Sequence, residues 1–367
     1  MNILIVGAGV VGCAIAYELA SRSARVTVVD ARGIGSGATR ASAGILAPHI
    51  EGHLAPLRTL GVRSLDLYDG FIDRVVADSG HWIDYQRTGT LQVAFTSDDA
   101  ATLCAAARDM AGLGVARTML DGSEARKLEP QLPAEVVAAL LVPDHGYVAA
   151  STLTRALLAA ATKHGASFTT SPAVAVRGGD SPEVDTRGGT LTADAVVIAA
   201  GSWSGLLADT NPRSEGAAAP IRPIRGQLLR LRLATPPSSR VIWGSRCYLV
   251  PRRDGAVLAG ATVEDVGFDE TATASGVLHL LAESVALLPI LQHAAFEEVR
   301  VGLRTMTPDE LPVIGASSTM RHVFYASGHY RNGVLLAPLT AAMVADLLLD
   351  GRERPELALV RPDRLGL

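Results

Sequence analysis

The sequence predicts an α/β fold, α+β overall, in which a parallel sheet flanked by helices is interleaved with a second, largely antiparallel β domain. Short, wholly apolar segments such as Ile3–Val6 and Ala195–Ala200 are typical of parallel strands buried on both faces. Segments that alternate apolar and polar residues, such as Leu229–Leu233, are typical of antiparallel strands. The length of 367 residues favours about two domains.

The first elements form a βαβ unit. Ile3–Val6 is a strand, Val10–Ser21 has the spacing of a helix, and Arg25–Asp30 is a second buried strand. Helical spacing returns at Arg58–Ala77, Asp98–Leu113, Leu153–His164, Gly276–Leu288 and Ala337–Leu349. Further strands are expected at Thr88–Phe95, Ala195–Ala200, Leu229–Leu233, Arg246–Val250, Ala256–Ala261 and Val323–Ala326, with a hairpin turn at 252–255.

The two kinds of strand are distributed unevenly along the chain. βαβ character occurs at both ends and in a middle segment, with antiparallel character between them. We therefore expect two interleaved domains, one formed by residues 1–80, 146–220 and 301–367 and the other by residues 81–145 and 221–300.

The composition excludes several classes of protein. Lys plus Arg (33) and Asp plus Glu (37) give a net charge of −4, which argues against a nucleic-acid binder with a basic face. Apolar residues at 48% and charged residues at 19% exclude intrinsic disorder. Cys13, Cys104 and Cys247 are too few and too scattered for a disulfide framework or a cysteine-rich metal site, so no metal is expected.

No targeting or membrane segment is expected. Met1 leads almost directly into the first strand, and not into the charged and apolar regions of a signal peptide. The longest largely apolar stretch, Gly333–Leu349, contains Pro338, Thr340 and Asp346 and falls short of the ~20 apolar residues that a spanning helix needs. We expect a cytoplasmic protein, and the sequence leaves a homo-oligomer open.

A glycine motif, Gly7-Ala8-Gly9-Val10-Val11-Gly12, lies between the first strand and the first helix. Gly7 permits a tight turn, Gly9 lets a pyrophosphate approach the backbone, and Gly12 lets helix and strand pack closely. The helix N-terminus then presents free N–H groups to phosphates. Asp30 ends the second strand, where its carboxylate can accept hydrogen bonds from a ribose. These residues predict a dinucleotide site without separating NAD from FAD.

Two other segments favour a bulky planar cofactor. Residues 35–44 form a loop of small side chains, which lets backbone amides come near such a group. The buried strand Ala195–Ala200 ends in Gly201, so backbone from a later part of the chain lies beside the same cofactor.

Several segments carry a resemblance to a known family. Besides the glycine motif they are Ala-Gly-Ile-Leu-Ala-Pro at 43–48, Ala-Gly-Ser-Trp-Ser-Gly at 200–205, Cys-Tyr-Leu-Val-Pro-Arg at 247–252, Gly-Leu-Arg-Thr-Met-Thr-Pro-Asp at 302–309 and Gly-His-Tyr-Arg-Asn-Gly-Val-Leu-Leu-Ala-Pro at 328–338. Here, and over its whole length, the chain resembles the D-amino-acid-oxidase-like FAD-dependent oxidoreductases, and among them the glycine oxidase branch associated with thiamine biosynthesis. The resemblance implies that the first of the two domains is a Rossmann-like FAD-binding domain and that the second binds substrate.

The resemblance implies FAD as the cofactor. In sarcosine-oxidase relatives a Cys just before a Thr-x-Thr-Pro-Asp segment attaches the flavin, but residues 301–304 here read Val-Gly-Leu-Arg, so noncovalent FAD is expected. Motif and resemblance together assign cofactor contacts to Gly7, Gly9, Val10, Val11, Gly12, Asp30, Ala31, Ala38, Thr39, Ala43, Gly44, Ile45, Ala173, Gly201, His329, Tyr330, Arg331, Asn332, Gly333, Val334 and Leu335.

By the same resemblance, Tyr248 and Arg304 hold the carboxylate of the substrate, and Arg331 either contacts it or serves the flavin. A guanidinium binds a carboxylate through two parallel hydrogen bonds, and a Tyr hydroxyl adds another donor. No side chain is assigned as a general base, since a neutral amine can release a hydride to flavin and the resulting imine hydrolyses in water. His329 is expected to contact flavin through its backbone.

Two positions depart from the glycine oxidase pattern. Arg246 replaces a His two residues before Tyr248, and Val263 replaces a Met after Gly-Ala-Thr. If strand alternation holds, Arg246 faces the same cavity as Tyr248 and selects substrates with a second acidic group. The alternative is that Arg246 lies at the mouth of the pocket, pairs with an acidic residue and reaches solvent.

The function expected from these features is FAD-dependent oxidative deamination of glycine or another small primary or secondary amino acid. Hydride would pass to flavin, and reoxidation by oxygen would give hydrogen peroxide. A dehydrogenase of the same family that passes electrons to a quinone or another carrier is the main alternative. Tyr248 and Arg304 disfavour an inactive flavin-binding subunit, and an NAD-dependent dehydrogenase would leave the loop at 328–333 unexplained.

Overall fold

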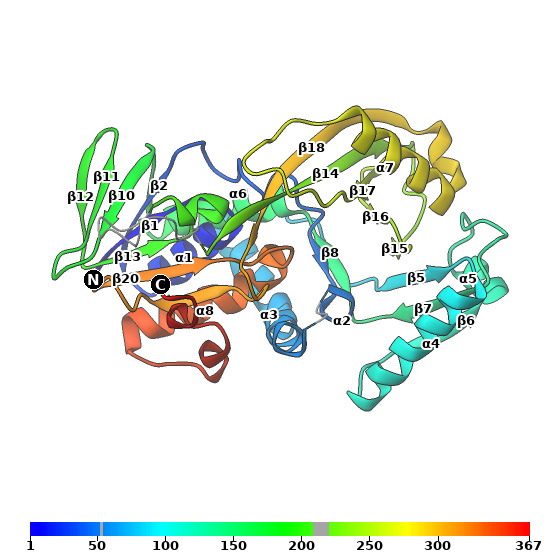
Figure 1. Cartoon of the computed structure of the whole chain (residues 1–367), viewed down its shortest axis with the longest axis horizontal. Coiled ribbons are helices and arrows are strands. Elements are labelled where there is room, and N and C mark those ends of the chain that lie inside the picture. The colour runs from blue at the N-terminus through cyan, green and yellow to red at the C-terminus, as the bar shows by residue number, and fades with distance from the viewer. Residues whose placement is uncertain (52–53, 208–219) are drawn as a thin grey trace.

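The computed structural model describes residues 1–51, 54–207 and 220–367. The chain forms a six-stranded sheet and an eight-stranded sheet, which lie on either side of the molecule along its long axis (Figure 1). Two small sheets accompany them: β10 (Ala173–Arg177), β11 (Glu183–Thr186) and β12 (Gly189–Thr192); and β3 (Ile45–Leu46), β8 (Gly146–Val148) and β4 (Tyr85–Gln86).

The six-stranded sheet is parallel except at one edge, where β19 runs antiparallel to β20. Its apolar strands are buried on both faces because helices cover one side and the β10–β12 sheet covers the other. The strands, in spatial order, are β19 (Val313–Ala316), β20 (Val323–Ser327), β13 (Ala195–Ile198), β1 (Asn2–Val6), β2 (Arg25–Asp30) and β9 (Ser167–Thr170). The covering helices are α1 (Val10–Ser21), α3 (Ala55–Ser79), α6 (Ala150–Lys163) and α8 (Gly333–Asp350).

The eight-stranded sheet is antiparallel except for the parallel pair β15 and β5. Its strands, in spatial order, are β18 (Ala295–Met306), β14 (Arg222–Arg232), β17 (Ala256–Gly260), β16 (Tyr248–Pro251), β15 (Val241–Trp243), β5 (Thr90–Ala94), β7 (Ala138–Val142) and β6 (Thr118–Asp121). Its helices are α4 (Ser97–Gly112), α5 (Gly122–Leu128) and α7 (Ala274–Leu287). The remaining short helices are α2 (Pro48–Glu51), η1 (Gly201–Gly205), η2 (Pro289–His293), η3 (Pro355–Leu359) and η4 (Pro362–Leu365).

This architecture confirms the predicted mixed α/β fold with a parallel and a largely antiparallel sheet. The bounds predicted for Val10–Ser21 and Arg25–Asp30 are those observed. The strand predicted at Arg246–Val250 instead begins at Tyr248, because residues 244–247 form a turn in which the Gly244 N–H donates to the Cys247 carbonyl. The boundary expected at 220 follows residues 208–219, which lie outside the described residues.

Helix α8 begins at Gly333 and not at the predicted Ala337, so Pro338 lies inside it. Proline cannot donate to the carbonyl four residues earlier. Here the Tyr68 hydroxyl donates to that carbonyl, on Val334, at 2.6 Å, and the Ser64 hydroxyl donates to the Leu335 carbonyl at 2.7 Å. Both donors are fully buried on α3, and they satisfy the backbone groups that the proline would leave open.

Among the described residues, α8 alone is long and apolar enough to cross a membrane. Of its 18-residue apolar window, 72% is buried inside the protein, and it packs against α1 and α3. Its apolar composition is therefore that of a core helix.

Candidate active site

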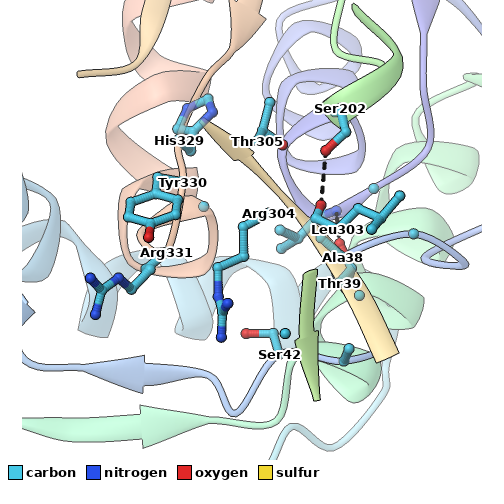
Figure 2. A pocket seen from close by; sticks show the side chains of 18 of the residues that line it. Ala38, Thr39, Ser42, Ser202, Leu303, Arg304, Thr305, His329, Tyr330 and Arg331 are labelled. Atoms are coloured by element: carbon cyan, nitrogen blue, oxygen red, sulfur yellow. Dashed lines mark hydrogen bonds between the residues drawn. The ribbon is translucent and has the colours of Figure 1, made fainter. Parts of the chain in front are cut away.

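A cavity of about 550 Å³ lies where the two large sheets meet. Its lining comes from the ends of β1 and β2, residues 36–45, the turn at 199–207, parts of β14, β15, β16 and β18, and residues 326–334. Parts of the chain that are distant in sequence therefore share one site, which is shown from close by in Figure 2.

The glycine motif lines one end of this cavity. Gly7 has φ +112°, and a Cβ there would overlap the Ala199 carbonyl oxygen; a Cβ at Gly12 would overlap the Gly7 carbonyl oxygen. The fold itself therefore requires glycine at both positions. At Gly9, by contrast, the nearest atom to an added Cβ is Oγ1 of Thr39 at 3.4 Å, an ordinary contact. Gly9 lines the cavity, so a side chain at this position would project into the cavity.

Asp30 is held beside the glycine turn. One oxygen of its carboxylate accepts from the Ala8 N–H at 2.8 Å, and the other accepts from the Arg32 N–H at 2.7 Å. These bonds fix the carboxylate at the cavity wall and leave lone pairs for a hydroxylated ligand. Thr39 lies opposite, and its Oγ1 accepts from the Val10 N–H at 3.0 Å.

A loop before α8 forms another wall. The first two residues of α8, Gly333 and Val334, line the cavity, and the side chain of the N-cap residue Asn332 does not cap the helix. An uncapped helix N-terminus carries partial positive charge. His329 is buried, which lowers its pKa to about 4, and its Nε2 bonds the Thr340 hydroxyl at 3.0 Å. The imidazole is therefore neutral at physiological pH and engaged with α8.

At the other end of the cavity, Arg304 and Tyr248 converge across two glycines. Arg304 is on β18, and its guanidinium lies across Gly226 on the neighbouring β14, where a Cβ would overlap it. Tyr248 is on β16, and its hydroxyl would be 2.7 Å from a Cβ at Gly260 on the neighbouring β17. The strands β14 and β17 are adjacent and lie between β18 and β16. The side chains of Arg304 and Tyr248 therefore extend toward each other across the sheet.

The guanidinium of Arg304 is fixed from one side only. Its Nη1 donates to the Thr262 carbonyl at 2.9 Å and more weakly to the Arg225 carbonyl at 3.3 Å. Both acceptors are neutral, so the positive charge has no carboxylate within ion-pair distance in the described part of the chain. Nη2 remains directed along the sheet surface, which leaves an edge of the guanidinium for an anionic ligand.

The two other predicted substrate residues lie farther out. Arg331 also lines the cavity, with its guanidinium 5.0 Å from the centre of the Tyr330 ring and pointing away from Arg304 in Figure 2. Arg246 lines the cavity mouth, where its side chain is 65% exposed and pairs with Glu283 of α7 at 3.1 Å. Arg246 precedes β16, so strand alternation does not relate it to Tyr248. Its position is the second one expected from the sequence, at the mouth of the pocket and paired with an acidic residue.

Comparison with known proteins agrees with this geometry. Residues 2–347 match the model of the DAO family, described as FAD dependent oxidoreductase. The chain belongs to this family. It is 35% identical to glycine oxidase of Geobacillus kaustophilus over 97% of its own length and 94% of that protein. It is 34% identical to the bifunctional protein ThiO/ThiG of Nostoc sp., covering 97% of this chain and 54%, about half, of that longer protein.

Two solved structures have the same fold as this chain. The crystal structure of glycine oxidase from Geobacillus kaustophilus superposes with a TM-score of 0.90 at 33% identity, over 96% of this chain and 95% of that one. Iminodiacetate oxidase from Chelativorans sp. BNC1 superposes with a TM-score of 0.89 at 26% identity, over 98% of each chain.

The residues present fit FAD, the family's cofactor. The cavity accepts backbone approach at Gly9, offers a carboxylate to a ribose at Asp30, and is lined by the N-terminal residues of α1 and α8, whose N-cap residues supply no side-chain cap. Of the predicted cofactor residues, Gly12 and Leu335 do not line the cavity, because Gly12 packs against Gly7 and Leu335 is buried in the core. All the others line it.

Several lining residues did not emerge from the sequence. Gly226 and Gly260 could have been found, because an isolated glycine inside a strand pattern marks a close approach of another group. Trp243 lies opposite Tyr248 on β15, with ring centres 5.1 Å apart, but strand pairing cannot be inferred from sequence spacing alone. Within the described residues, no group of three His, Cys, Asp or Glu side chains is placed to hold a metal.

Proposed function

We propose that the protein is an FAD-dependent amino-acid oxidase acting on glycine or another small primary or secondary amino acid, with oxygen as acceptor and hydrogen peroxide as product. The observation that carries the proposal is the convergence of Arg304 and Tyr248 over Gly226 and Gly260, which forms a binding place for one small carboxylate. The extensive similarity to glycine oxidases supports glycine as the first substrate to test.

The role of the protein is to bind and orient the substrate. When bound, FAD supplies the hydride acceptor and returns the electrons to oxygen. Arg304 binds the carboxylate through charge-assisted hydrogen bonds, and the Tyr248 hydroxyl donates a further one. Together they fix the α-carbon in one orientation, which converts a bimolecular encounter into a positioned reaction.

The lining offers no side chain suited to deprotonate the substrate amine. Asp30 is the only carboxylate among the described lining residues, and it lies at the glycine-turn end. His329 is bonded to Thr340, and burial raises the pKa of the Cys247 thiol to about 12, so that thiol stays protonated. The amine must therefore enter neutral, with its own lone pair assisting hydride departure.

The same cysteine bears on how the cofactor is held. Cys247 is the one cysteine in the described lining of the cavity, and a protonated, buried thiol is a poor nucleophile. We therefore propose noncovalent FAD. Denaturation by acid or heat should release all the flavin into the supernatant, and flavin that remains with the polypeptide would contradict this.

The proposed substrate is small and carries one carboxylate. Trp243 and Tyr248 wall the site on one side, and the charge of Arg246 is balanced by Glu283 at the mouth. A second acidic group on the substrate would have to compete with Glu283 for Arg246.

A peroxide assay across glycine, sarcosine, D-alanine, D-aspartate and iminodiacetate tests the proposal. We expect peroxide from the small monocarboxylates, in an amount matching the oxygen consumed. Arg304→Ala should lower kcat/KM by about 10- to 150-fold with the FAD content unchanged, because charge-assisted hydrogen bonds are lost. Flavin reduction with transfer to a dye but not to oxygen would instead identify a dehydrogenase.

A further inference from the structure

A second cavity, of about 270 Å³, shares Ser42 with the first in its lining. It is enclosed by the start of α6, the turn between β16 and β17, residues 82–84, and side chains of β14 and β18. Arginines dominate its lining: Arg40, Arg155, Arg230, Arg252, Arg253 and Arg300. Two aspartates, Asp84 and Asp254, are the only carboxylates among the described lining residues.

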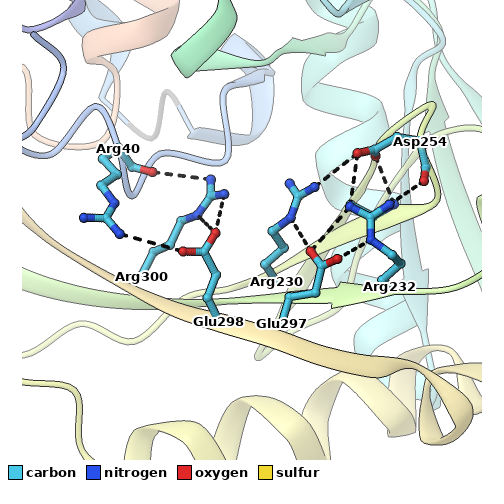
Figure 3. Close-up of polar contacts among 8 residues, drawn as sticks. Arg40, Arg230, Arg232, Asp254, Glu297, Glu298 and Arg300 are labelled. Atoms are coloured by element: carbon cyan, nitrogen blue, oxygen red, sulfur yellow. Dashed lines mark hydrogen bonds and ion pairs between the residues drawn. The ribbon is translucent and has the colours of Figure 1, made fainter.

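Half of these arginines are already paired. Figure 3 shows Arg230 sharing Glu297 and Asp254 with Arg232, and Arg300 bound to Glu298, which also lies 3.8 Å from Arg40. Each of these arginines has a carboxylate partner, so the paired group does not by itself call for a ligand, although its four arginines outnumber its three carboxylates by one.

The other arginines have no carboxylate at ion-pair distance in the described part of the chain, although Asp84 lies near enough to Arg252 and Arg253 to interact with their charges. Arg155, Arg252 and Arg253 make no ion pair within the described residues, and neither does Asp84. Three unpaired positive charges and one unpaired negative charge give these four residues a formal charge of +2. A group carrying about two negative charges would neutralise it, as a phosphate monoester does at neutral pH.

Arg252 gives the strongest indication that this cavity binds an anion. It is 6% exposed, its Nη2 donates to the Ala43 carbonyl at 2.7 Å, and its guanidinium lies 4.7 Å from the centre of the Tyr147 ring. Its Nη1, also buried, has no hydrogen-bond partner among the described residues. A buried, charged donor is rarely left unsatisfied, and burial lowers the pKa of Arg252 to about 10.

Helix α6 contributes donors from another direction. It is 14 residues long, and its N-cap residue, Ala149, cannot cap it with a side chain. Its first residues, Ala150, Ser151 and Thr152, all line the cavity. Free N–H groups at a helix start bind phosphate and other oxyanions.

Asp84 narrows the chemistry of the ligand. It is 5% exposed, and its Oδ1 also lacks a partner. A carboxylate beside an anion site is unfavourable unless the ligand brings a donor, such as a hydroxyl group, to meet it. The exposed ring of Trp82 and the side chain of Leu258 give an organic part of the ligand a surface to contact.

We propose that this cavity binds a small hydroxylated phosphate monoester, with the phosphate between Arg252, Arg253 and the α6 N-terminus and a hydroxyl group on Asp84. The site is separate from the FAD and substrate cavity and does not depend on the proposed function. The Arg252–Ala43 hydrogen bond connects the two cavities, since Arg252 lines the second and Ala43 lines the first.

Calorimetric titration of the FAD-loaded protein at constant ionic strength tests the proposal, with inorganic phosphate and ribose 5-phosphate as probes. Both should bind saturably at one site per chain, with the ester tighter. The double variant Arg155→Ser/Arg253→Ser changes exposed side chains, so it should keep the fold and FAD. It should weaken binding at least tenfold, since charge-assisted donors are lost.

Matched controls separate this site from others. Arg187→Ser removes an exposed arginine from the β11–β12 turn and should leave phosphate affinity unchanged. Arg304→Ala should also leave it unchanged, because that residue belongs to the other cavity. Absence of saturable binding, equal affinity in the double variant, loss of binding in Arg304→Ala, or equal affinity for the two probes would overturn the proposal.

Discussion

At the nucleotide end of the FAD cavity the chain presents mainly backbone, whereas at the substrate end it presents long side chains. The first end is built from one continuous βαβ segment, with its turn, its helix start and Asp30 within 30 residues of the N-terminus. The second is assembled from five strands, β14 to β18, whose lining residues come from 226 to 305. The glycine-turn end is therefore formed by local structure, and the end with Arg304 and Tyr248 by tertiary arrangement.

The two ends nevertheless use glycine for the same purpose. Gly9 leaves room in the cavity, and Gly226 and Gly260 leave room for the side chains of Arg304 and Tyr248. Gly7 and Gly12 differ from these because the protein itself fills the space. Substitutions that add one methyl group can therefore separate folding, cofactor binding and substrate binding.

The largest effect is expected at Gly7. An Ala there would have φ +112° and a Cβ overlapping the Ala199 carbonyl, so it should destabilise the fold by at least about 4 kcal/mol. Thermal unfolding measures this. Gly112→Ala is the matched control, since nothing lies within 4 Å of its Cβ position, and its stability should stay within about 1 kcal/mol. Equal stability of the two variants would show that the glycine turn is not constrained as described.

Gly9→Val should keep the fold but lose FAD. Its added atoms would enter the cavity where the backbone faces the pyrophosphate, and only Thr39 is nearby. Circular dichroism should therefore remain native while the visible absorbance of bound flavin is lost. A Gly9→Val protein with full FAD occupancy would refute the role given to this glycine.

Gly226→Ala should disturb the substrate end alone. Its Cβ would displace the flexible end of Arg304, so kcat/KM for the amino acid should fall by about tenfold or more with FAD content unchanged. Steady-state kinetics measure this loss. If Gly226→Ala matched the wild type while Arg304→Ala was impaired, the path of Arg304 across Gly226 would be wrong.

Acid should weaken the fold before carboxylates titrate. Burial lowers the pKa of His329 to about 4, and burial, then His49 and Arg87, lower that of His145 well below its usual value. Unfolded histidine takes up a proton near pH 6.5, so this stability is complete above that pH and is lost as pH falls toward the folded pKa values. Between pH 7.5 and 5, His329 should lower the free energy of unfolding by about 2 kcal/mol, and His145 should lower it further in the same direction.

Chemical denaturation at the two pH values measures this difference. His145→Gln removes one of the two titrations, so its own loss between pH 7.5 and 5 should be smaller than that of the wild type. Unchanged or higher stability at pH 5 in the wild type would contradict the neutral, buried state of both imidazoles.

The smallest effect is expected at Arg246. Its exposure and its pairing with Glu283 place it at the mouth, so Arg246→His should change the ratio of kcat/KM for glycine and D-aspartate by less than about threefold. A shift of tenfold or more toward glycine would restore the hypothesis that Arg246 selects a second acidic group.

The sequence predicts the nucleotide end better than the substrate end for a physical reason. The glycine motif, Asp30 and the helix after them interact within one short segment, so spacing alone determines their geometry. Trp243 and Gly226 lie beside Tyr248 and Arg304 only through the pairing of strands. The early start of α8 was missed because Tyr68 and Ser64, on a distant helix, satisfy the carbonyls around Pro338.

Anaerobic mixing of the FAD-loaded protein with glycine tests most directly whether this cavity oxidises an amino acid held by Arg304. The absorbance of oxidised flavin should disappear in the wild type, and the reduction should be slower by about tenfold or more in Arg304→Ala at equal FAD content and subsaturating glycine. If the flavin stays oxidised with glycine and with sarcosine, D-alanine and iminodiacetate, the assignment of amino-acid oxidation to this site is contradicted.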